Sequence, residues 1–93
     1  MRKKLLLGNW KMNKTREETK VFALGSLALS AVAELHGIDI GVAPAYLSLP
    51  VVKKYNPNLL VAAQNVHYQP AGAYTGEVSI SMLKEINISW VII

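Results

Sequence analysis

The stretch Leu5-Leu6-Leu7-Gly8-Asn9-Trp10-Lys11-Met12-Asn13 decides the fold prediction. It predicts a short buried strand that opens directly into a turn carrying an amide and an ammonium group. In an open α/β sheet, ligands bind beyond the carboxyl ends of the strands. Asn9 and Lys11 alternate along an extended path, so their side chains can point to the same side. They are candidates for a ligand-binding pair; the alternative is a turn asparagine beside a solvated surface lysine.

Composition limits the class of protein. The chain has 93 residues, of which 52% are hydrophobic and 17% charged. Because soluble domains average about 25% charged residues, this balance indicates apolar surface that is meant to be covered. The chain has no cysteine, hence no disulfide framework and no thiol nucleophile, which is consistent with a cytoplasmic protein. The apolar run after the basic start is only three residues, shorter than the roughly 7–15 of a signal peptide.

Charge and hydropathy disfavour two further classes of partner. The net charge is +4, but the basic residues are scattered and are not interleaved with aromatic side chains, so we expect no nucleic-acid partner. The apolar stretch 21–35 is shorter than the roughly 18 residues of a membrane span, and it contains Ser26, Ser30 and Glu34. It favours a core-facing helix, and we expect no membrane partner.

Predicted strands and helices alternate along the chain. Thr15-Arg16-Glu17-Glu18 is a capping-box pattern, and it predicts a helix over 16–35 that Gly37 ends. The apolar stripe of this helix, expected to face the core, consists of Val21, Leu24, Leu27, Ala28, Ala31, Val32 and Leu35. The other predicted elements are strands over 3–8, 38–43, 59–63 and 88–93, a short helix opened by Ser48 and Pro50 through Tyr55, and a helix capped by Ser79 to about Ile86. The strands are apolar and lack hairpin signals, which predicts a single βαβαβαβ domain over 1–93 with a parallel sheet.

The connection 64–78 is too long for a routine strand-to-helix loop of about 2–6 residues, which indicates a functional loop. Its turn Tyr74-Thr75-Gly76 suits a loop that inserts into a partner; a plain surface turn is the alternative. Gln64 and Asn65 could line a site, but backbone-satisfying roles are favoured. His67 has no acid or nucleophile placed for a relay, so we predict no catalytic role for it.

Other side chains have structural interpretations. Trp10 and Met12 alternate to the side opposite Lys11 and are predicted packing residues. His36 ends a predicted helix and is expected to interact with helix carbonyls. The acidic residues are too dispersed for a metal site, and neither glycine-rich phosphate-loop pattern occurs.

Three motifs in order resemble the triose-phosphate isomerase family. They are Gly8–Asn13, Ala63–Val66 and Gly72–Ser79. The resemblance implies a (β/α)₈ barrel of about 250 residues, of which this chain would be roughly the first half, strands one to four.

The resemblance also implies roles for particular residues. Lys11 would be catalytic, and Asn9 and Lys11 would bind a phosphorylated triose without metal or organic cofactor. The family reaction interconverts dihydroxyacetone phosphate and glyceraldehyde 3-phosphate through an enediolate. The resemblance further implies a homodimer formed through the Gly72–Ser79 loop, in which Thr75 reaches the partner's site. The dimer-loop residues are Tyr74, Thr75, Gly76 and Glu77.

The family's electrophilic histidine and base glutamate follow strand four and are not among these 93 residues. We therefore expect the chain alone to be inactive and to form the N-terminal part of an isomerase. The alternative is a non-catalytic half-barrel that binds phosphate or serves as an interaction module.

Overall fold

The computed structural model describes residues 2–93. Its elements in chain order are β1 (Lys4–Asn9), α1 (Arg16–Gly25), α2 (Leu27–Leu35), β2 (Ile38–Ala43), a 3₁₀ turn (Tyr46–Ser48), α3 (Leu49–Tyr55), β3 (Leu60–Ala63), α4 (Ile80–Glu85) and β4 (Trp90–Val91). Most predicted boundaries are confirmed within one or two residues. Strand four is the exception, because only two of the six predicted residues pair with a neighbour.

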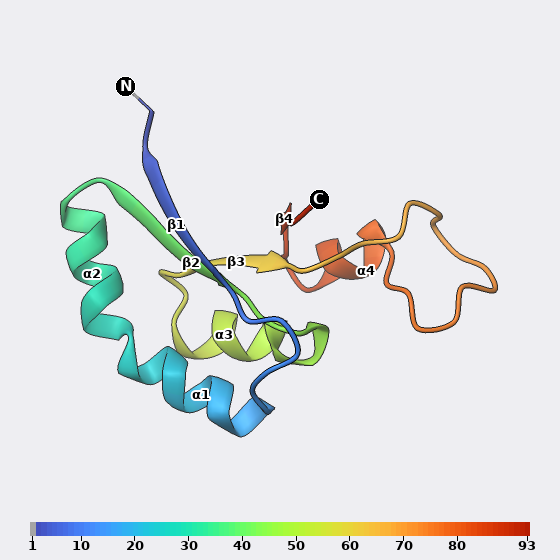
Figure 1. Cartoon of the computed structure of the whole chain (residues 1–93), viewed down its shortest axis with the longest axis horizontal. Helices are drawn as coiled ribbons and strands as arrows, with labels where there is room; N and C mark the ends of the chain where they lie inside the picture. Colours follow the sequence, from blue (N-terminus) through green and yellow to red (C-terminus); the bar gives the residue numbers. More distant parts are fainter. Residues whose placement is uncertain (1) are drawn as a thin grey trace.

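The four strands form one parallel sheet in the order β1-β2-β3-β4 (Figure 1). β1 and β2 pair over their full lengths, from Lys4 opposite Ile38 to Asn9 opposite Ala43. Helices separate successive strands, and α1, α2 and α3 lie along the same side of β1 and β2 (Figure 1). This is the α/β arrangement of the first half of a (β/α)₈ barrel, as predicted.

The hydrophobic core lies where α3 and α4 pack against β2 and β3. Its buried members are Val42, Leu49, Val52, Leu59, Val61, Ala63, Leu83 and Ile88. Gly41 allows β2 and β3 to approach closely, since a Cβ at this position would lie 2.3 Å from the carbonyl oxygen of Leu60.

The predicted 16–35 helix is two helices, because Ser26 interrupts it. Ser26 has φ −98° and ψ 3°, and its hydroxyl donates to the carbonyl of Ala23. The capping box at the start is confirmed: the Thr15 amide donates to Glu18 Oε1 at 2.9 Å, and the Glu18 amide donates to Thr15 Oγ1 at 3.2 Å. The stop is confirmed as well, since Gly37 has φ +67°.

The predicted core-facing stripe of this segment was wrong. Val21, Leu24 and Leu35 are exposed, whereas the buried positions of α1, α2 and their junction are Thr19, Ala23, Ser26, Ser30 and Ala33. Small side chains let the helices approach their neighbours closely, and the hydroxyls find buried partners. Apolar periodicity alone cannot detect a face built this way.

A buried polar network joins α2 to the end of α3. Asn56 is fully buried, and its Nδ2 lies 3.1 Å from Ser26 Oγ and 3.2 Å from Ser30 Oγ. Its Oδ1 accepts the backbone amide of Asn58 at 3.2 Å. The predicted turn at 56–58 is thus a point of attachment between elements. Ser48 likewise bonds to Thr19, at 3.0 Å, and does not cap α3 with its side chain.

β1 is not the buried strand that was predicted. Leu5 is 43% and Leu6 63% exposed, and successive residues of a strand point to opposite faces, so both faces of β1 are accessible. The reason is that β1 pairs only with β2 and lies at an edge of the sheet.

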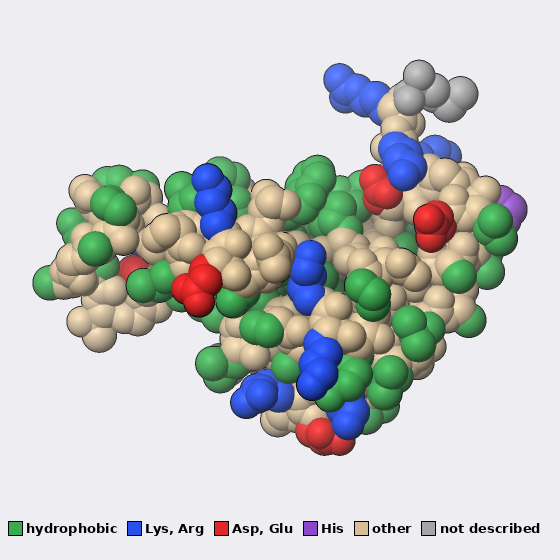
Figure 2. Space-filling view, turned by 180° about the vertical axis from the view of Figure 1, so that it is seen from behind, with side chains coloured by type: hydrophobic (Ala, Val, Ile, Leu, Met, Phe, Trp, Pro, Cys, Tyr) green, Lys and Arg blue, Asp and Glu red, His purple; other side chains and the backbone are tan. Residues whose placement is uncertain are grey.

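In Figure 2, hydrophobic and basic side chains are interspersed on the back of the molecule. Within residues 2–93, no helix has the length and apolarity needed to cross a membrane.

Candidate active site

The carboxyl ends of the parallel strands meet at one edge of the sheet, which brings the predicted ligand-binding pair to neighbouring strand exits. Asn9 ends β1 opposite Ala43 at the end of β2. Gln64 directly follows β3. Lys11 lies in the turn after β1, and the structure joins this turn to both of the other exits.

The backbone of Lys11 adopts an uncommon conformation that is fixed from two sides. Its φ is +56°, in the left-handed region that residues other than glycine rarely occupy. Its amide donates to Asn9 Oδ1 at 3.0 Å, and its carbonyl accepts from Gln64 Nε2 at 2.8 Å. Such a conformation costs about 1–3 kcal/mol and persists only where the surroundings determine it. These two hydrogen bonds hold the Lys11 backbone in this conformation.

Gln64 ties the exits of three strands together. Besides the Lys11 carbonyl, its Nε2 donates to the carbonyl of Ala43 at 2.8 Å. The same Ala43 carbonyl accepts the amide of Trp10 at 3.1 Å. The expectation that Gln64 satisfies backbone groups is confirmed. Sequence reasoning missed that the backbone it satisfies is that of the candidate site.

The side chains of Asn9 and Lys11 are available to a ligand. Because Asn9 Oδ1 accepts the Lys11 amide, its Nδ2 group remains a donor. Lys11 is exposed, and the two ion pairs found within residues 2–93, Lys3–Asp39 and His67–Glu77, do not involve it. The pair thus offers a positive charge and an amide donor, which suits an anionic or enolate-forming ligand.

Of the two predicted packing residues beside the pair, one packs. The ring of Trp10 meets Phe22 of α1 edge to face at a centroid distance of 5.0 Å, and Lys14 Nζ lies 5.3 Å from the Trp10 ring. Met12, by contrast, is 94% exposed.

The predicted dimer loop projects from the body of the molecule (Figure 1). Tyr74, Thr75, Gly76 and Glu77 are all exposed, and Gly76 has φ +83°. Figure 1 places this loop, drawn in orange, well away from the turn that follows β1. The structure therefore brings Asn9, Lys11 and Gln64 together, and it does not bring Thr75 to the site of its own chain.

An acidic side chain lies near His67, but not at the distance that a relay would need. Nδ1 of His67 is 3.8 Å from Glu77 Oε2. The loop returns on itself so that His67 pairs with Ser79, and this closure brings together residues that are ten positions apart. The distance exceeds that of a hydrogen bond, so the pair forms no proton relay as it stands.

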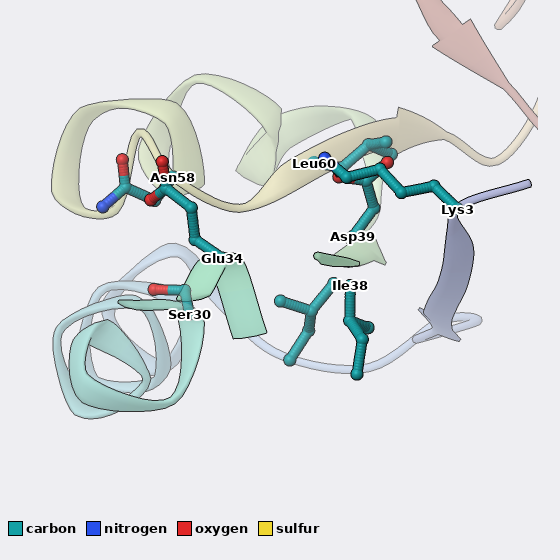
Figure 3. Close-up of a pocket in the computed structure, with 8 residues that line it drawn as sticks. Lys3, Ser30, Glu34, Ile38, Asp39, Asn58 and Leu60 are labelled. Atoms are coloured by element: carbon teal, nitrogen blue, oxygen red, sulfur yellow. The ribbon is translucent and has the colours of Figure 1, made fainter. Parts of the chain in front are cut away.

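A cavity of about 190 Å³ lies at the edge of the sheet opposite the candidate site (Figure 3). Its lining residues are Lys3, Ser30, Glu34, Ile38, Asp39, Ile40, Asn58 and Leu60. Ile38 begins β2 and Leu60 begins β3, so this is the amino-terminal edge, where barrel residues serve stability and not catalysis. Lys3 and Asp39 form an exposed ion pair at 3.1 Å there.

Within residues 2–93, His, Asp and Glu side chains form no group of three that could hold a metal ion.

Comparisons with known proteins show the family of the chain. The family model described as triosephosphate isomerase matches residues 4–93. The chain is 48% identical to the triosephosphate isomerase of Chlorobium phaeobacteroides over 99% of its own length, and 44% identical to that of Mycoplasma capricolum over all of it. It is 40% identical to the triosephosphate isomerase of Chlamydia felis. In each case the chain spans just over a third of the relative's length, 36–37%.

Proposed function

Since the chain belongs to the triosephosphate isomerase family, we propose that residues 1–93 supply the charge-stabilising part of an isomerase active site. The substrate would be a phosphorylated triose, dihydroxyacetone phosphate or glyceraldehyde 3-phosphate. The observation that carries the proposal is the geometry of Lys11: a strained backbone fixed by two hydrogen bonds beneath an exposed ammonium group.

The chemistry assigned to the pair follows from its charge. Isomerisation moves a proton between adjacent carbons through an enediolate, which places negative charge on the substrate oxygens. The Lys11 ammonium would offset that charge and that of the phosphate, and Asn9 Nδ2 would donate a hydrogen bond beside it. Groups preorganised in this way act where charge develops in the transition state.

The carbon acid also needs a base, and the acidic residues of this chain lie elsewhere. They are Glu17 and Glu18 in α1, Glu34 in α2, Asp39 in β2, Glu77 in the projecting loop and Glu85 in α4. Lys11 and Asn9 can bind an anion, but neither is a carboxylate base. The base and the acid that protonates the enediolate would have to come from further segments of a complete barrel, so we propose that the 93 residues alone do not turn over substrate.

We further propose that the complete protein is a cytoplasmic homodimer formed through the Gly72–Ser79 loop. The loop is exposed and projects away from its own chain, and a second copy offers it the turn at Lys11 as a polar surface. Within residues 2–93 Lys11 takes part in neither ion pair, which supports the alternative for the isolated chain, a non-catalytic module that binds phosphate.

The test uses a complete barrel that carries residues 1–93 as its first part, compared with the isolated chain. In the complete protein, Lys11→Ala should lower kcat/KM by about 10²–10³-fold and weaken binding of a phosphate-bearing competitive inhibitor. Lys84→Ala, which removes the same charge from the exposed face of α4, is the matched control and should change little. Near-normal turnover in Lys11→Ala would refute the site. Turnover by the isolated chain would refute the need for further segments, and phosphate binding without turnover would favour the module.

A further inference from the structure

The projecting loop is closed at its base and stiffened by a turn near its tip. The His67 amide donates to the Val78 carbonyl at 2.8 Å, where the two ends of the loop come together. Nearer the tip, the Glu77 amide donates to the Tyr74 carbonyl at 3.0 Å. Between these two bonds, the loop has a small interior of its own.

The His67 ring contacts two tyrosine rings that are themselves exposed, Tyr74 by 42% and Tyr68 by 79%. The imidazole lies 4.3 Å from the Tyr74 ring and 4.8 Å from the Tyr68 ring, centroid to centroid, tilted by 39° and 35°. The spacing to Tyr68 falls within the range of about 4.5–7 Å for favourable aromatic pairs, and the spacing to Tyr74 is slightly shorter than that range. Tyr74 in turn covers Gly72, where φ is +135° and an added Cβ would lie 2.8 Å from Tyr74 Cε2. The His67 side chain is only 20% exposed.

Neither ring nitrogen of His67 makes a hydrogen bond within residues 2–93. The contact from Nδ1 to Glu77 Oε2, at 3.8 Å, is longer than a hydrogen bond, and the Glu77 side chain is 40% exposed, so solvent screens it. Nε2 is buried and has no hydrogen-bond partner within the described chain. A buried polar atom left in this state is unfavourable. The ring therefore contributes to the loop through its faces, by stacking.

We propose that His67 is a positioning residue that holds the 66–79 loop in its docking form before a partner arrives, by stacking against Tyr68 and Tyr74. The partner is a second copy of this chain, so the association half of the proposal rests on the homodimer proposed above. A loop that is already ordered avoids most of the entropy cost of ordering on binding. His67 would thus affect association without touching the partner's site.

The experiment separates stacking from polar chemistry by comparing His67→Phe, which keeps an aromatic ring, with His67→Ala, which removes it. His36→Ala is the matched control, because His36 is the only other histidine and lies at the end of α2. Amide hydrogen exchange is measured at residues 67 and 77, whose amides report on the loop, at a concentration where the protein is monomeric. The amides of β2 report whether the fold is intact.

If stacking holds the loop, His67→Ala raises exchange at residues 67 and 77 by about tenfold, since each aromatic pair is worth a factor of roughly 2–13. His67→Phe and His36→Ala leave exchange unchanged, and β2 stays protected in all variants. Equal exchange in His67→Ala and the unsubstituted chain would overturn the proposal. So would a His67→Phe variant as open as His67→Ala, since it would show that a ring nitrogen is required.

The dimer dissociation constant, measured by sedimentation, tests the claim that His67 affects the association of two copies of the chain. It should rise in His67→Ala in proportion to loop opening and stay unchanged in His67→Phe. If the loop opens as expected but every variant is monomeric, the positioning role stands and the homodimer is refuted. If association is normal in His67→Ala although its loop is open, the claim that His67 affects docking is refuted.

Discussion

Replacing Gln64 with methionine tests whether the Lys11 turn is held by its neighbours. Methionine has a similar length and shape but no N–H donor. Gln64→Met therefore removes the 2.8 Å bonds to the carbonyls of Lys11 and Ala43 while keeping the volume. Glu85→Met, which places the same side chain at an exposed position of α4, is the matched control.

The two measurable effects should differ in size. Two neutral hydrogen bonds contribute about 1 kcal/mol each, and relaxation of the left-handed Lys11 backbone returns part of a strain of about 1–3 kcal/mol. The net loss of stability should thus be at most about 2 kcal/mol. A misplacement of a catalytic group by about 1 Å, however, can cost on the order of 10²-fold in rate. Activity should fall further than stability alone would explain.

The assay is steady-state isomerisation in the complete barrel, alongside thermal denaturation. We expect kcat/KM to fall about 10–100-fold, while Tm drops by no more than about 8 °C, at about 2–4 °C per kcal/mol for a protein of barrel size. Glu85→Met should match the unsubstituted protein in both. A Gln64→Met enzyme with normal kcat/KM and a lowered Tm would refute the reasoning, because Gln64 would then act on stability only.

Three further predictions concern stability. Asn56→Leu should cost about 2–4 kcal/mol, because it removes four side-chain hydrogen bonds from a fully buried position; a loss under 0.5 kcal/mol in denaturant unfolding would contradict this. Gly41→Ala should abolish cooperative unfolding, since its Cβ would lie 2.3 Å from the Leu60 carbonyl oxygen, and a normal near-ultraviolet dichroism spectrum would argue against it. The Thr15 backbone amide, and then the Thr15 side chain, lowers the pKa of Glu18, so this contribution is fully present above the ordinary pKa of 4.5 and is lost as the pH falls through the lower folded value. Glu18→Gln removes the titrating carboxyl and should flatten that part of the stability–pH profile, and an unchanged profile would show that the Glu18 carboxylate does not contribute.

The sequence predicted the fold well where local signals dominate. The capping box of Thr15 and Glu18 and the glycine stop at Gly37 mark helix ends through local hydrogen bonding and a positive φ. Such features depend on a few adjacent residues, so they survive any tertiary context. Burial depends on distant partners, and here prediction failed: the apolar stripe of α1 and α2 is exposed because hydroxyls at Ser26 and Ser30 face Asn56 instead.

The residues of the candidate site stay a prediction from the sequence, and the contacts that hold them could not be predicted from it. The motif around Asn9 and Lys11 indicated a charged pair after the first strand. No local sequence pattern predicts that Gln64, 53 positions away, donates to the Lys11 carbonyl. The contact arises only once parallel pairing places the exits of β1 and β3 on the same edge. His67 and Glu77 illustrate the same limit, since the closure of a long loop brought them together.

The support of Lys11 crosses strands, and this decides how the site is built. The turn after β1 is held by Gln64, which reaches it from the end of β3, and by the Trp10 amide, which donates to the Ala43 carbonyl at the end of β2. Because these contacts come from β2 and β3, the geometry of the site depends on the whole sheet and not on the Asn9–Lys11 motif alone. A chain that keeps the Asn9–Lys11 motif but loses the β3 exit would therefore keep the residues of the site and lose its geometry.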